Sequence, residues 1–226
     1  MEPWLAKTPA VVQAWYPGME GGNAIAAVLF GDVNPSGRLP MTFPRKLADS
    51  PAHALGAYPG KNGTVRYEEG LLVGYRWFDA KKIDPLLPFG HGLSYTSFEY
   101  ANLKMVAPRV APPPGAMAPV VVVQLEVKNT GPRAGAEVVQ VYVHPVAPRL
   151  PRPPQELKGF ARVFLKPGEK KTVAVTLGAD AFAFYDPAKK AWVAEAGEFL
   201  LRVRGTARLG RFEVPFTLKT SLAVSR

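Results

Sequence analysis

The sequence predicts a mainly β chain that ends in an antiparallel β-sandwich and begins with the incomplete remnant of an α/β sandwich domain. Residues 120–226 contain short apolar runs with period-two alternation, separated by turn signals about every 8 to 12 residues. Residues 1–96 contain one apolar run followed by one Ala-rich helical pattern. The Pro-rich segment Ala107–Pro119, which cannot continue a helix or a central strand, separates the two parts.

The first part opens with half of a strand-turn-helix-strand unit. The run PAVVQAWY (Pro9–Tyr16) is typical of a buried strand, and GGNAIAAVLF (Gly21–Phe30) has helical composition and spacing. Asn23 is able to cap this helix near its start, and Gly31 is expected to end it. A further short strand is expected at Leu39–Phe43.

The stretch WYPGMEGG joins the expected strand to the helix. Pro17 and Gly18 are expected to reverse the chain, and the next two glycines let it enter the helix. Glu20 precedes the positive end of the helix, where a carboxylate is stabilised by about 0.3 to 1 kcal/mol, so we predict that it is a capping residue. From there to Tyr95 the chain is expected to be mostly irregular.

One strand and one helix cannot bury both faces of a parallel sheet. Residues 1–96 are therefore predicted to be the end of an α/β domain whose earlier strands lie upstream of Met1. Residues 97–119 are assigned to a first strand and a Pro-rich linker, and residues 120–226 to the sandwich. We expect the sandwich, from about Tyr100 onward, to fold independently.

In the sandwich, every second residue of the first two runs points to one face. These runs are VVVVQLEVKNTG, which begins at Val120, and AEVVQVYVHP, which begins at Ala136. No helix is expected in this part. Further strands are predicted at Leu157–Leu165, Lys171–Leu177, Ala181–Tyr185, Ala191–Ala194, Phe199–Val203 and Arg211–Leu218.

Composition narrows the classes of function. The net charge of +10 arises in the second part: residues 1–96 hold nine basic against eight acidic residues, and residues 97–226 hold nineteen against ten. These charges are scattered singly, which favours a solvated basic surface over a nucleic-acid site. The absence of cysteine excludes disulfides and thiolate metal sites. The N-terminal sequence lacks the features of a signal peptide, so the chain is expected to be cytoplasmic or to lack its true beginning.

Three long motifs resemble a known enzyme family in order and spacing. Val11–Pro44, Tyr67–Asp79 and Pro85–Tyr100 are similar to the C-terminal third of glycoside hydrolase family 3 enzymes, chiefly β-glucosidases. The downstream segments VKNTGPRAGAEVVQVYV, PRPPQELKGFARVFLKPGE and AEAGEFLLRV resemble the immunoglobulin-like, fibronectin type III-like domain that closes many of these proteins.

This resemblance implies a three-part enzyme: a barrel with an aspartate nucleophile, an α/β domain with a glutamate acid/base, and the fibronectin-like domain. Both carboxylates precede the matched region, so no catalytic, substrate-binding or metal-binding residue and no cofactor is expected on this chain. We therefore expect a C-terminal portion that is inactive alone, with Met1 marking an artificial boundary, a split gene or a broken reading frame. The compartment stays open between periplasmic, secreted and cytoplasmic.

The partners implied are a β-glucoside or oligosaccharide substrate in the full-length enzyme, and the missing barrel and α/β domain, in cis or as a separate chain. Two alternatives stay open: a β-xylosidase portion of the same family, and a non-catalytic fibronectin-like module that binds a polymer or a protein. No nucleic-acid or membrane partner is expected.

The chain's own carboxylates are interpreted as structural. Glu68 and Glu69 are adjacent, and neighbouring side chains in an extended segment point to opposite faces, so a structural or interface role is favoured. Asp79 and Asp84 flank AKKI and are interpreted as turn residues. For Asp32, before VNPSG, an Asx-type turn is expected.

Histidine and serine give no catalytic signature. His53, His91 and His144 are far apart and have no ligand spacing, so no metal site is predicted. His91, between two glycines, is interpreted as a hydrogen-bonded structural residue. The sequence GLSYT lacks the second glycine of a nucleophile elbow.

An aromatic ring can stack on the face of a sugar or pack in a protein core, so each exposed or buried aromatic side chain has two possible roles. Packing in a core or between domains is favoured for Trp15, Tyr16, Trp77 and Phe78. Tyr185 and Trp192 are expected to bury against the sandwich strands.

Overall fold

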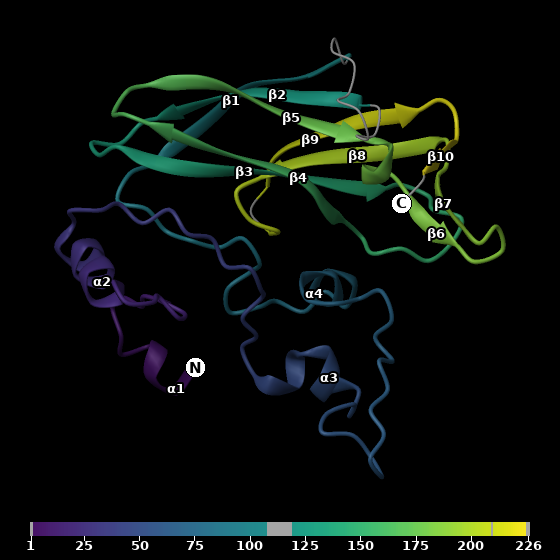
Figure 1. Cartoon of the computed structure of the whole chain (residues 1–226), viewed down its shortest axis with the longest axis horizontal. Helices are drawn as coiled ribbons and strands as arrows, with labels where there is room; N and C mark the ends of the chain where they lie inside the picture. Colours follow the sequence, from purple (N-terminus) through teal and green to yellow (C-terminus); the bar gives the residue numbers. More distant parts are fainter. Residues whose placement is uncertain (1, 108–118, 209, 225–226) are drawn as a thin grey trace.

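A computed structural model describes residues 2–107, 119–208 and 210–224 of the chain. Figure 1 shows two parts: a β-sandwich, and an N-terminal part of short helices and extended chain that lies along one side of it. The predicted linker residues 108–118 lie outside the described residues. Among the described residues, no helix is long and apolar enough to cross a membrane.

The sandwich consists of two main antiparallel sheets. One has the strand order β1–β2–β5 and the other β4–β3–β8–β9, while β10–β7–β6 forms a small third sheet. The bounds are Phe98–Val106 (β1), Pro119–Asn129 (β2), Gly135–Pro145 (β3), Glu156–Leu165 (β4), Lys170–Gly178 (β5), Phe184–Asp186 (β6), Ala191–Ala194 (β7), Gly197–Arg204 (β8), Gly210–Leu218 (β9) and Leu222–Val224 (β10). The predicted antiparallel sandwich is confirmed.

The core follows the alternation that the sequence displays. Val123, Leu125 and Val127 of β2 face Val139 and Val141 of β3 between the sheets, and all are almost fully buried. Burial of each such side chain stabilises the fold by about 1.5 to 3 kcal/mol.

One predicted strand in the sandwich, Ala181–Tyr185, is wrong in its first half. A 3-10 turn of three residues, η2, occupies Ala179–Ala181. The side chain of Phe182 lies fully inside the core. Its carbonyl accepts a hydrogen bond from Arg152 at 3.1 Å instead of a strand bond. Strand β6 begins only at Phe184.

The N-terminal part holds five short helical segments: α1 (Glu2–Leu5), α2 (Gly21–Phe30), η1 (Leu47–Asp49), α3 (Pro51–Ala54) and α4 (Tyr75–Ala80). Helix α2 has the predicted bounds, and Gly31 ends it in the left-handed conformation at φ 85°. Helices α3 and α4 and the turn η1 fall where irregular chain was expected.

The two predicted strands of this part are absent. Pro9–Tyr16 forms no ladder with any described strand, and Val11, Val12 and Trp15 are about half exposed. Leu39–Phe43 contributes one isolated bridge, between Phe43 and Leu87. A strand needs a neighbour that pairs with its backbone N–H and C=O groups along its length. Among the described residues Pro9–Tyr16 has no such neighbour, and Leu39–Phe43 is hydrogen-bonded only at its two ends, to residues 90–91 and 86–87.

The cap of α2 also differs from the prediction. Glu20 occupies the N-cap position but makes no side-chain hydrogen bond to the helix backbone. Its carboxylate accepts a hydrogen bond from the amide of Asn23 at 2.5 Å instead. The capping roles predicted for Glu20 and Asn23 are therefore both wrong, because the two side chains bind each other.

Candidate functional site

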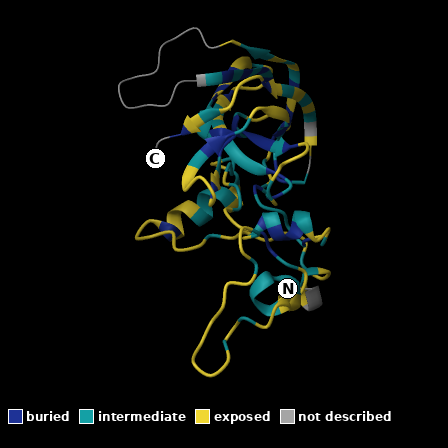
Figure 2. Ribbon diagram, turned by 90° about the vertical axis from the view of Figure 1, so that its right-hand side faces the viewer, coloured by how far each residue is buried: buried dark blue, intermediate teal, exposed yellow. Residues whose placement is uncertain are grey.

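The most elaborate polar and aromatic structure in the described chain is the seam, defined as the contact between residues 31–96 and the sheet that contains β3, together with the loops that flank this sheet. Strand β3 is buried on both faces, which is unusual for a sheet that would otherwise have one side in water. Gln140 and Tyr142 point outward from it, yet they are only 3% and 0% exposed. Figure 2 shows buried residues concentrated inside the sandwich, and exposed loops at the far end of the N-terminal part.

Tyr75, at the start of α4, is the centre of the seam. Its ring stacks on Phe89 at 4.9 Å and meets Tyr142 edge-on at 5.8 Å. Its hydroxyl oxygen accepts a hydrogen bond from the N–H of Leu157 at 2.8 Å. Burial raises the pKa of Tyr75, and burial likewise raises the pKa of Tyr142. Neither hydroxyl is therefore ionised at neutral pH.

Gly90 allows the chain to pack closely on Gln140, the hydrogen-bond partner of Tyr142. Gly90 has φ 81°, and a Cβ atom there would lie 2.6 Å from the side-chain oxygen of Gln140. Gln140 accepts a hydrogen bond from the Tyr142 hydroxyl at 2.7 Å and donates one to the carbonyl of Gly205 at 2.6 Å. The buried amide is thus satisfied while the chain of Gly90 covers it.

An ion pair crosses the seam at its other end. Arg38 and Glu137 lie 2.6 Å apart, with side chains 13% and 8% exposed. Arg38 also donates to the carbonyl of Gly92, and the N–H of Val138 donates to Glu137 at 2.7 Å. The pair lines a cleft of about 550 Å³. The ion pair holds the segment around Arg38 against β3, because both charged groups are also hydrogen-bonded to the backbone.

Asp79, predicted as a turn residue, belongs to the seam instead. It lies near the end of α4, accepts a hydrogen bond from Gln155 at 2.8 Å and pairs with Arg208 at 3.0 Å. Arg208 also donates to the carbonyls of Phe78 and Ile83. Burial raises the pKa of Asp79, although Gln155 and Arg208 oppose the shift. The turn prediction is wrong because α4 continues through Asp79.

The other predicted carboxylates do not gather. Asp32 is exposed, and Asp84 is exposed and pairs with Arg45 at 3.2 Å. Glu68 is exposed, whereas Glu69 is half-buried with one carboxylate oxygen enclosed. Within the described ranges, Glu69 has neither a hydrogen bond nor an ion pair from its side chain.

The histidines lie in three separate surroundings. His53 is 3.0 Å from the Ser50 hydroxyl, and His144 contacts the carbonyl of Pro154. His91 is hydrogen-bonded through its main chain to Leu39 and Pro88, and burial, with Arg38 nearby, lowers its pKa. In the part of the chain that the structure describes, no three histidine or acidic side chains are grouped as metal ligands would be.

The aromatic predictions divide. Trp77 and Phe78 are 5% and 3% exposed, as expected, and the indole of Trp77 donates to the carbonyl of Asp49. Trp192 packs partly buried against the core. The prediction for Tyr185 is wrong, because Tyr185 is about half exposed. Trp15 is about half exposed and meets Phe43 edge-on, and Tyr16 is fully exposed, so neither lies in a core of the described chain. Their packing between domains stays a prediction.

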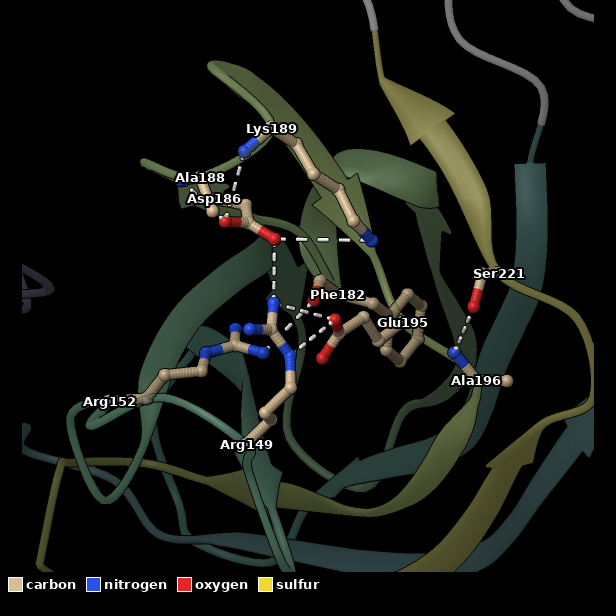
Figure 3. Close-up of polar contacts among 9 residues, drawn as sticks. All are labelled: Arg149, Arg152, Phe182, Asp186, Ala188, Lys189, Glu195, Ala196 and Ser221. Atoms are coloured by element: carbon tan, nitrogen blue, oxygen red, sulfur yellow. Dashed lines mark hydrogen bonds and ion pairs between the residues drawn. The ribbon is translucent and has the colours of Figure 1, made fainter.

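A second cleft lies at one end of the sandwich, next to a cluster of two carboxylates on one arginine, and it was not predicted. It has a volume of about 410 Å³ and includes Arg149, Phe184 and Glu195. Figure 3 shows Arg149 between Asp186 and Glu195, at 2.6 and 2.9 Å. Two carboxylates beside a cleft that Phe184 and Phe199 line resemble a glycosidase site in outline, so the contacts that hold them decide what they can do.

Both carboxylates of this cluster accept hydrogen bonds from the same guanidinium, that of Arg149. Burial alone would raise the pKa of Asp186, but the N–H groups of Ala188 and Lys189 and the guanidinium of Arg149 hold it below its ordinary value. A retaining glycosidase needs one carboxyl group protonated, with a raised pKa, and one free to attack. Arg149 binds both groups here, so the cluster is a structural ion-pair network that fastens β6 to the turn before β8.

Comparison with known proteins identifies two domain types in the chain. The model of the glycosyl hydrolase family 3 C-terminal domain matches residues 1–75, and that of the fibronectin type III-like domain matches residues 137–207. The chain is 46% identical to thermostable beta-glucosidase B of Acetivibrio thermocellus, over 99% of the chain and 28% of the relative. It is 45% identical to beta-glucosidase BoGH3A of Bacteroides ovatus, over 87% of the chain and 26% of the relative.

Solved structures agree with this match. The beta-glucosidase of Kluyveromyces marxianus in complex with glucose superposes with a TM-score of 0.87 at 40% identity, over 98% of the chain and 26% of that protein. Beta-glucosidase 3B of Thermotoga neapolitana in complex with glucose gives a TM-score of 0.87 at 35% identity, over the whole chain and 30% of that protein. The chain therefore spans between a quarter and a third of the length of these relatives.

Proposed function

Since the chain belongs to glycoside hydrolase family 3, in which it corresponds to the C-terminal region with a fibronectin type III-like domain, we propose that it is the structural C-terminal portion of a retaining β-glucosidase. In the complete enzyme, the reaction is hydrolysis of terminal non-reducing β-D-glucosyl residues. The catalytic carboxylates belong to the part that precedes this region in its relatives, and the chain is inactive without that part.

The observation that carries the proposal is the apolar surface on residues 11–33. Val11, Tyr16 and Met19 before α2, and Leu29 and Phe30 at its end, are between half and fully exposed. Helix α2 has no charged residue, and Asn23 is its only polar side chain. A helix with apolar side chains around most of its circumference belongs in the interior of a larger protein. This surface fits the face of an α/β domain whose other strands the relatives carry.

The carboxylates of the described residues also support a structural role for this chain and a catalytic role for the part that precedes it. The seam fixes Glu137 and Asp79 in ion pairs, and the end cleft fixes Asp186 and Glu195 on Arg149. A nucleophile and an acid must each be free to meet the glycosidic bond, about 5 to 5.5 Å apart in a retaining enzyme. The seam instead gives the sandwich the role of a rigid support for the α/β domain.

Reconstitution of hydrolysis tests the proposal. The chain would be mixed with the part of Acetivibrio thermocellus beta-glucosidase B that precedes its matched region, and p-nitrophenyl β-D-glucoside and β-D-xyloside would be assayed. We expect no turnover from either part alone and turnover of the glucoside by the mixture. A faster reaction with the xyloside would instead assign the β-xylosidase specificity. Turnover by this chain alone that is lost on Glu68→Gln or Glu69→Gln would overturn the proposal.

A further inference from the structure

Residues 56–73, here called the arm, leave the body of the molecule between α3 and α4. They contain no helix or strand, and Lys61 and Thr64 close the tip by exchanging two backbone hydrogen bonds of 3.0 and 2.9 Å. Figure 1 shows this blue loop as the part of the ribbon that reaches furthest from the sandwich. Residues 61–68 are all exposed. The arm is thus presented to whatever lies beyond the N-terminal part.

The arm contains glycine and charged residues, as a flexible linker does, but it also carries large apolar and aromatic side chains that a linker does not need. It exposes Tyr58, Val65, Tyr67, Leu71 and Val73, all about half exposed or more, and Tyr67 is 82% exposed. Tyrosine is enriched among the residues that anchor protein interfaces, because it combines a large apolar ring with a hydroxyl. An arm that displays such side chains in water matches the composition of an interface.

Glu69 provides a second, independent sign of a missing partner. One of its carboxylate oxygens is enclosed, and within the described chain neither a hydrogen bond nor an ion pair satisfies the group. Leaving a charged acceptor without a donor costs more than leaving a neutral one, and it is offset where a partner supplies the donor. The adjacent Glu68 is exposed and needs no such donor. Glu69 therefore needs a donor from outside the described chain, whereas Glu68 can be solvated by water.

We propose that the arm docks onto the preceding part of the same enzyme, with Tyr67 packing against an apolar surface and Glu69 accepting hydrogen bonds from a cationic or N–H donor there. The inference rests on the proposed function and names which segment makes the contact. The identity of the docking partner is inferred from how much of the family model and of the relative this chain matches. The family 3 C-terminal domain model includes the arm and ends at residue 75, and the A. thermocellus relative is matched over only 28% of its length.

The test measures the affinity of this chain for the preceding part of A. thermocellus beta-glucosidase B by isothermal titration calorimetry. Glu69→Gln keeps the side-chain shape and removes the charge, and we expect it to raise Kd about tenfold or more. Tyr67→Ser is expected to raise Kd about tenfold, as for an interface anchor. Glu68→Gln, one residue away, is the matched control and is expected to change Kd by less than about twofold.

Stability of the separate chain distinguishes an interface role from an internal one. Glu69→Gln is expected to leave the Tm of the chain unchanged or slightly raised, because no internal hydrogen bond is lost. A fall in Tm would show that Glu69 serves the chain's own fold and would overturn the inference. A complex that forms equally well with all three variants would also overturn it, while leaving the proposed function intact. If the wild-type parts do not associate and show no activity, both fail.

Discussion

At the scale of single residues, the seam depends on polar side chains that the sandwich and the N-terminal part together shield from water. Arg38 and Glu137 are buried by segments 99 residues apart in the sequence, and each also binds a backbone group. A buried pair is a weak source of net stability, but breaking it leaves one charge without compensation. The contribution of the pair to the free energy of unfolding is therefore seen when one of the two charged groups is removed.

We predict that Glu137→Gln lowers the free energy of unfolding by about 3 kcal/mol, because Arg38 is left as a buried, unpaired cation. The matched control is Asp84→Asn, which breaks an exposed pair with Arg45 and should cost less than about 1 kcal/mol. Urea denaturation followed by tryptophan fluorescence measures both. Equal losses in the two variants would mean that the seam pair is no more buried in solution than the exposed one.

Asp79 makes stability depend on pH in an unusual direction. Its pKa is raised in the folded chain, mainly by burial, so the folded state binds more protons than the unfolded state between the ordinary and the raised pKa. Stability contributed by Asp79 is therefore complete below about pH 4 and is lost as the pH rises through the raised value.

Asp79→Asn removes this titration. We expect the stability of the variant relative to the wild type to increase as the pH is raised from about 4 to 7, measured by urea unfolding at several pH values. A relative stability that decreases over this range would mean that Arg208 and Gln155 outweigh burial and that the pKa is lowered.

At the scale of elements, alternation in the sequence predicted the strands because burial acts on every second residue of a strand whatever its partner. The Val-rich run of β2 has this pattern, and so does β3. Helix α4 has six residues and no side-chain cap, so nothing local distinguishes it from loop. Its conformation depends on Tyr75, Trp77 and Phe78 burying against the sandwich and the N-terminal part, a tertiary effect that sequence periodicity does not show.

The segment from α4 to Tyr95 covers the outer face of β3, so we expect it to behave as part of the sandwich unit. A chain of residues 74–226 should unfold cooperatively with a Tm close to that of the full chain. Residues 97–226 should unfold about 10 °C lower, because exposing Tyr142 costs about 2 to 3 kcal/mol at about 4 °C per kcal/mol. Calorimetry of the two chains measures this. Equal Tm values would mean that the sandwich is complete from Tyr100 onward.

At the scale of the whole molecule, the family motifs predicted the relatives that the chain matches, whereas the division at residues 96 and 120 stays a prediction. The seam could not be predicted, because Arg38 and Glu137, or Tyr75 and Tyr142, carry no signal of their pairing in one sequence. The exposure of Trp15 and Tyr16 and the absence of a strand at Pro9–Tyr16 have a common physical cause. Their apolar character is real, but the surface that would cover it is not supplied by the described chain.

This exposed surface leads to the most direct test of the division between a structural and a catalytic portion. Amide hydrogen exchange would be measured for residues 9–33 of this chain alone and after mixing with the preceding part of A. thermocellus beta-glucosidase B. We predict weak protection in the separate chain, where Val11, Tyr16 and Phe30 face water, and strong protection in the mixture. Strong protection of residues 9–33 in the separate chain, or none in a mixture that has regained β-glucosidase activity, would contradict this.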